Sequence, residues 1–147
     1  MPSGSRALTD LLDGEDLRLL ADIGFIAATR GLHGQAGAIF AALQALRPDT
    51  EAPSIGLALT DLAAGRPQDA LDRLARGPRT PAVLVFQGIA AVRCGRRRDA
   101  VALFGRLIAD HPDQPAADLA RAVLAELDGS QATGLSSLFA DPRAVTR

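Results

Sequence analysis

The sequence lacks several residue types, and each absence excludes a class of function. None of its 147 residues is lysine, tryptophan or tyrosine, so all 16 basic residues are arginine. Aromatic residues amount to 3 %, which leaves few rings on which nucleic-acid bases could stack. With a formal net charge of −1, the chain has no overall attraction for nucleic acid or anionic lipid. We therefore expect a protein that binds no nucleic acid.

Cysteine and histidine are also scarce. The single cysteine, Cys94, cannot form an internal disulfide, which is typical of proteins in a reducing compartment. Neither His33 nor His111 has a cysteine or acidic partner at the spacing of a metal site. The sequence contains no glycine-rich phosphate loop, and no histidine near Cys94 that would activate it as a nucleophile. We predict no catalytic residues, no metal site and no cofactor, and hence a protein that is not an enzyme.

Long hydrophobic runs are missing, although hydrophobic residues make up 48 % of the chain. The longest apolar stretch, residues 81–92, is interrupted by Gln87 and is shorter than the ~20 residues of a membrane span. The first residues show no pattern of basic and then apolar residues that would indicate a signal peptide. These features predict a cytoplasmic protein that does not insert into a membrane.

Alanine and leucine are abundant and β-branched residues are sparse, a composition that favours helices. Glycine and proline mark helix ends at regular intervals. Thr80 and Pro81, for example, are typical of an N-cap followed by a first-turn proline. We predict an N-terminal segment over residues 1–14, a helical domain over 15–128 and a flexible tail over 129–147. The expected fold is all-α, with helices near residues 15–30, 33–46, 52–64, 67–76, 81–94, 97–110 and 115–128.

The first six of these helices form three pairs that share one pattern of small and large residues. A glycine ends the first helix, an alanine follows five residues later, and a large apolar residue follows after four more. These positions are Gly31, Ala36 and Phe40, then Gly65, Ala70 and Leu74, then Gly95, Ala100 and Phe104.

Small residues also lie seven positions before each glycine, at Gly24, Ala58 and Gly88. We expect them to face the alanines of the second helices, so that the two helices of a pair approach closely. The first two glycines are 34 residues apart and the next two are 30 apart, because Gly77 and Pro78 cut the second pair short. One pair cannot bury its own apolar face, so the pairs must stack.

On this pattern, residues 17–112 resemble the tetratricopeptide repeat (TPR) family, with residues 115–128 as a capping helix. The resemblance implies a TPR-like α-solenoid of three helix pairs plus a C-terminal capping helix. Members of the family are scaffolds that bind peptides and proteins. The chain departs from the family at the aromatic positions of the first helices. Leu20, Ser54 and Leu84 stand where the family often has Trp, and Ala27, Asp61 and Ala91 where it often has Tyr.

The first helices carry almost no polar residues on the side that would line the concave face of such a stack. A surface helix normally has a polar face, so an apolar face is either covered or marks a binding site. We expect a partner protein or peptide to insert an apolar segment in this groove. The predicted groove residues are Phe25, Ile55, Leu59, Leu62, Val85, Ile89, Val92 and Arg93.

Other occupants of the groove stay open at this point. The chain could fill it with tail residues Leu135, Leu138 and Phe139, or with Leu8, Leu11 and Leu12 of the N-terminal segment. In a small, tightly curved stack the groove could also close up as core. A homodimer could bury the same face. In these cases the protein would be a structural scaffold or a homodimer adaptor.

A narrower resemblance concerns residues 42–49, ALQALRPD, together with the apolar first helix before them. They look like small tetratricopeptide-like proteins encoded with the Hrp-type secretion systems of plant-associated bacteria. Three-repeat chains of this size also include chaperones of bacterial type III secretion. The resemblance implies a chaperone that shields an apolar segment of a secreted subunit until export, without ATP.

Overall fold

The computed structural model describes residues 12–129, so the predicted tail and most of the predicted N-terminal segment lie outside the described residues. Within this range the chain is all-α, as predicted, with seven helices and no strand. Each predicted helix boundary agrees with the observed one to within one residue. The helices are α2 (Gly14–Thr29), α3 (His33–Leu46), α4 (Glu51–Ala63), α5 (Pro67–Arg76), α6 (Pro81–Arg93), α7 (Arg97–Asp110) and α8 (Pro115–Gly129).

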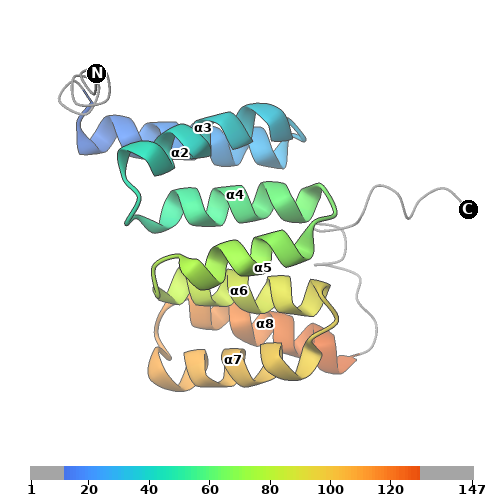
Figure 1. Cartoon of the computed structure of the whole chain (residues 1–147). Helices are drawn as coiled ribbons and strands as arrows, with labels where there is room; N and C mark the ends of the chain where they lie inside the picture. Colours follow the sequence, from blue (N-terminus) through green and yellow to red (C-terminus); the bar gives the residue numbers. More distant parts are fainter. Residues whose placement is uncertain (1–11, 130–147) are drawn as a thin grey trace, which may run out of the picture.

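The helices follow one another as antiparallel neighbours from α2 to α8 (Figure 1). Each packs against the next along the chain, and α2, α4, α6 and α8 also contact one another in that order. These four helices therefore form one layer, and α3, α5 and α7 lie against it.

The same turn ends α2, α4 and α6. At the first, Gly31 has a φ of 78°, its N–H bonds the Ala28 carbonyl at 3.1 Å, and the Leu32 N–H bonds the Ala27 carbonyl at 2.9 Å. Gly65 and Gly95 have φ values of 73° and 76° and are followed by the same pair of bonds. This is the Schellman motif, which favours glycine because a side chain is strained at positive φ.

Two helix starts carry side-chain caps, and the one at Thr80 was predicted from the sequence. The Asp13 carboxylate accepts hydrogen bonds from the N–H groups of Glu15 at 2.8 Å and Asp16 at 3.0 Å, and the Asp16 carboxylate accepts from the Asp13 N–H. This capping box begins α2. At α6 the Thr80 hydroxyl accepts from the Val83 N–H at 3.3 Å, and Pro81 occupies the first turn.

Phenylalanine rings lie against the glycines of the first helices, and the alanines predicted at the close approach, Ala36, Ala70 and Ala100, are fully buried. A Cβ built on Gly24 would come within 2.8 Å of the Phe40 ring, and one on Gly56 would overlap the same ring. Phe40 therefore fills the space between α2 and α4. Phe104 in α7 lies against Gly88 in α6 in the same way. Both rings are fully buried.

Candidate binding site

Half of the predicted groove residues are not available to a partner. Ile55, Leu62, Val85 and Ile89 are at most 6 % exposed and belong to the main hydrophobic core. Their prediction as open groove residues is wrong. The helical period identified their apolar side, but α4 and α6 pack against each other on that side.

The last helix contributes to this closure. α8 contacts both α6 and α7, and its residues Ala120 and Val123 belong to the same core cluster as Val85 and Ile89. The stretch 115–128 was predicted only as a cap at the end of the stack. Its small residues Ala117 and Ala120 are fully buried, which lets α8 lie close against the helices before it.

The other predicted groove residues are half-buried and lie at the edges of the core. Leu59 and Val92 pack against the main cluster. Phe25 packs against both core clusters, and its ring centroid is 4.7 Å from that of Phe40. Arg93, also half-buried, is in the last turn of α6. Phe25 also lines a pocket.

That pocket lies between the first half of α2 and the start of α4 and has a volume of about 420 Å³. Leu17, Ala21 and Phe25 come from α2, at a spacing of four residues that places them on one side of the helix. Leu43 of α3 and Ala52 of α4 complete the apolar wall. We call this the α2–α4 pocket.

Charged side chains surround the mouth of the α2–α4 pocket. Two are basic and two are acidic, and all are exposed: Arg18, Asp22, Arg47 and Glu51. Glu51 also accepts a hydrogen bond from the Thr80 hydroxyl, which connects the starts of α4 and α6. An apolar pocket with a polar rim suits one or two apolar side chains of a partner whose backbone or charges meet the rim.

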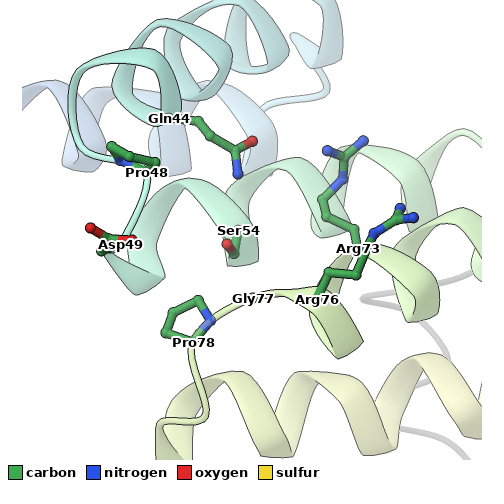
Figure 2. Close-up of a pocket in the computed structure, with 8 residues that line it drawn as sticks. All are labelled: Gln44, Pro48, Asp49, Ser54, Arg73, Arg76, Gly77 and Pro78. Carbon is green, nitrogen blue, oxygen red and sulfur yellow. The ribbon is translucent and has the colours of Figure 1, made fainter.

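A second pocket, of about 400 Å³, lies where α5 ends early (Figure 2). As predicted, Gly77 ends α5, which has only 10 residues. The chain then passes close to α4, where a Cβ on Gly77 would lie 3.1 Å from the Ser54 hydroxyl oxygen. Unlike the α2–α4 pocket, it has mainly polar walls, formed by Gln44, Pro48, Asp49, Ser54, Arg73, Arg76, Gly77 and Pro78.

Asp61, next to this pocket, is a buried carboxylate held by two arginines. Its oxygens accept hydrogen bonds from Arg66 Nη2 at 2.8 Å and from Arg73 Nε at 3.0 Å. The hydrogen bond from Arg66 to Asp61, and the charge of Asp61, raise the pKa of the Arg66 guanidinium. Arg73 therefore has a structural partner, which makes it a poor candidate for binding a ligand in the second pocket.

Sequence reasoning missed most residues of the α2–α4 pocket. Leu17, Leu43 and Ala52 come from three helices, and no single periodic pattern contains them. The available signal was the apolar spacing of four residues in α2, of which Phe25 was predicted as a groove residue.

The residues considered for metal or nucleophilic chemistry are dispersed. His33, at the start of α3, and His111, at the end of α7, are both exposed. Cys94 is a half-buried C-cap of α6. Within residues 12–129, no three histidine, cysteine or acidic side chains are grouped so that they could hold a metal ion. Among the helices of the same range, none is both long enough and apolar enough to span a bilayer.

Comparisons with protein-family models, with curated proteins and with solved structures found no match to this chain.

Proposed function

We propose that this chain is a non-catalytic protein-binding module of the TPR-like α-solenoid class, which holds an apolar segment of a partner in the α2–α4 pocket. The observation that carries the proposal is the pocket itself, with an apolar wall that includes Phe25 and a rim of exposed charges. The repeated Schellman turn and the order of helix contacts support the solenoid assignment. A cytoplasmic chaperone for a type III secreted subunit remains the specific form of this proposal.

The test uses a variant that changes the pocket and preserves the fold. Ala52 lines the pocket and is the second residue of α4, where a carboxylate interacts favourably with the helix dipole. Ala52→Asp therefore places a charge on the apolar wall at little cost to the helix. Val101→Asp, on an exposed position of α7 away from the pocket, is the matched control.

The full-length tagged chain and both variants are purified from the native host, and bound proteins are identified by mass spectrometry. The partner is then purified and its affinity measured by calorimetry. We expect one stoichiometric partner whose Kd rises at least about tenfold with Ala52→Asp, since a carboxylate placed against the apolar segment of the partner must be desolvated, at a cost of more than about 1.4 kcal/mol. The affinity should be unchanged with Val101→Asp. A partner that binds Ala52→Asp normally would contradict the pocket assignment.

A second candidate function is a structural scaffold without a client. The observation that favours it is the closure of the predicted groove, where Ile55, Leu62, Val85 and Ile89 are core residues. Purification of the chain with no stoichiometric partner would support this second function and contradict the first.

A further inference from the structure

The outer side of α2 carries exposed large apolar residues. Leu19, Ile23 and Ile26 are 59 %, 44 % and 53 % exposed. Their spacings of four and three residues place them along one line of the helix. Glu15 lies four residues before Leu19 and Arg30 four residues after Ile26, so both charges lie on the same line. We call the line formed by these five residues the α2 stripe.

Inside the stack, the positions that correspond to the apolar residues of the α2 stripe are less exposed. With the repeat intervals of 34 and 30 residues, Ile23 corresponds to Leu57 in α4 and Gln87 in α6, which are both half-buried. Leu19 and Ile26 correspond to four further positions of these two helices. Those four positions are all buried: Pro53, Thr60, Val83 and Ala90. In the stack α3 packs against α4, and α5 packs against α6. Within residues 12–129 no helix precedes α2, which lies with α3 at one end of the stack (Figure 1).

The α2 stripe is complementary to itself when reversed. An acidic residue begins it, three apolar residues follow, and a basic residue ends it. If two such helices lie antiparallel around a two-fold axis near Ile23, Leu19 meets Ile26 of the partner subunit, and Glu15 meets Arg30 of the partner subunit. No ion pair within residues 12–129 engages either Glu15 or Arg30. A two-fold contact of one patch with itself is the commonest arrangement of homodimers.

We propose that a second copy of this chain covers the α2 stripe, with the two α2 helices antiparallel. The two stacks then join end to end through their first helices. The dimer is separate from the proposed function, because the α2–α4 pocket uses another side of α2, formed by Leu17, Ala21 and Phe25. It is also separate from a dimer through the concave groove, whose residues are largely buried within one chain.

The dimer should be weak and reversible. One pair of helices buries less than the ~1,200 Å² of a standard stable interface, so we expect a roughly micromolar Kd. Analytical ultracentrifugation of the full chain over a concentration series measures this constant. Leu19→Asp should abolish dimer formation, and because Leu19 is exposed, the circular dichroism spectrum should not change. Val101→Asp, also at an exposed apolar position, should leave the Kd unchanged.

The charges provide a test by exchange. Glu15→Arg or Arg30→Glu alone places like charges together twice in the two-fold dimer, and each should raise the Kd roughly tenfold. The double variant Glu15→Arg with Arg30→Glu restores opposite charges and should return the Kd to near that of the parent chain. A role of either residue in the monomer alone would not produce this rescue.

Cross-linking tests the antiparallel orientation. In a Cys94→Ala background, which removes the only native thiol, Leu19→Cys and Ile26→Cys chains are purified separately, mixed and treated with a short bis-maleimide. The mixture should yield a cross-linked heterodimer in much higher amount than either chain alone, and Ile23→Cys should cross-link with itself.

Three results would overturn the proposal. The first is a chain that stays monomeric up to about 1 mM, a concentration far above a micromolar Kd. The second is a dimer whose Kd does not change with Leu19→Asp. The third is cross-linking of Leu19→Cys chains mainly with each other. None of them bears on the α2–α4 pocket, which the co-purified partner and Ala52→Asp test separately.

Discussion

Glycines inside helices have opposite roles in this protein, depending on what lies next to them. Gly88 in α6 faces the Phe104 ring, which occupies the space that a side chain would need. Gly105 in α7 has no atom within 4 Å of a Cβ built on it, so at that position glycine only weakens the helix.

We predict that the same substitution at these two positions has opposite effects. Gly88→Ala should lower the free energy of unfolding by about 1–3 kcal/mol, because the buried Phe104 ring must move in a packed core. Gly105→Ala should raise it by about 0.5–1 kcal/mol, because alanine loses less backbone entropy in a helix. Urea unfolding followed by circular dichroism measures both. Equal effects of the two variants would contradict the packing described for Phe104.

At the scale of elements, the turn between the helices of a pair has one geometry and different side-chain contacts. In a Schellman motif the residue after the glycine often contacts the third-last helical residue. In the second pair these two residues are Arg66 and Asp61, which form an ion pair at 2.8 Å. In the first pair the same positions hold Leu32 and Ala27.

This comparison gives a prediction for the Asp61 cluster. The double variant Arg66→Leu with Arg73→Ile replaces both arginines by the residues at the same positions of the first pair. It leaves the buried Asp61 carboxylate without a cation. The double variant should unfold at a clearly lower denaturant concentration than the parent chain, because the buried carboxylate loses both cations. Adding Asp61→Ala should recover most of that loss, since an apolar replacement of a whole buried ion cluster is often neutral or stabilising. Chemical denaturation of the parent, double and triple variants measures the recovery, and a triple variant no more stable than the double would contradict it.

The raised pKa of Arg66 has no consequence near neutral pH. Since the folded-state pKa lies above the unfolded-state value, the stabilisation is complete below the unfolded value and is lost only as the pH rises through the folded value. Both values are far above neutrality, so Arg66 gives no pH dependence to stability there.

At the scale of the whole molecule, the side of α4 and α6 that we predicted as an open groove is mostly interior. Ile89 is 5 % exposed and belongs to the core cluster that joins α4, α5, α6, α7 and α8. Leu59 is half-buried at the edge of that cluster. The two residues had been predicted as equivalent groove positions.

We therefore predict that Ile89→Asp unfolds the chain or lowers its Tm by more than about 10 °C, because an unpaired charge in the core costs several kcal/mol. Leu59→Asp should cost less, since its side chain can turn toward water, and Val101→Asp should cost almost nothing. Thermal unfolding followed by circular dichroism ranks the three variants. An Ile89→Asp chain as stable as Val101→Asp would show that this face is open after all.

How much could be predicted from the sequence depended on the range of the interaction. The ends of α2, at Asp13 and Gly31, are determined by residues within five positions of each other, so capping and turn preferences were sufficient. Phe40 was identified as the large apolar residue of the first pair, but its contact with Gly56 was missed, because 16 residues separate the two and no local pattern connects them. The α2–α4 pocket was missed for the same reason.

The sequence by itself determined the helices, their ends and the three-fold repetition of glycine, alanine and large apolar residues. These follow from backbone preference and local hydrogen bonds, which act within a few residues. Only the tertiary structure decided which apolar faces became core, which formed the α2–α4 pocket and which stayed exposed as the α2 stripe. The helical period gives the direction of a side chain from its own axis, whereas its burial depends on how closely neighbouring helices approach. That distance is determined by contacts such as that of Phe40 with Gly56, and by the packing of α6 against α8, between residues far apart in the chain.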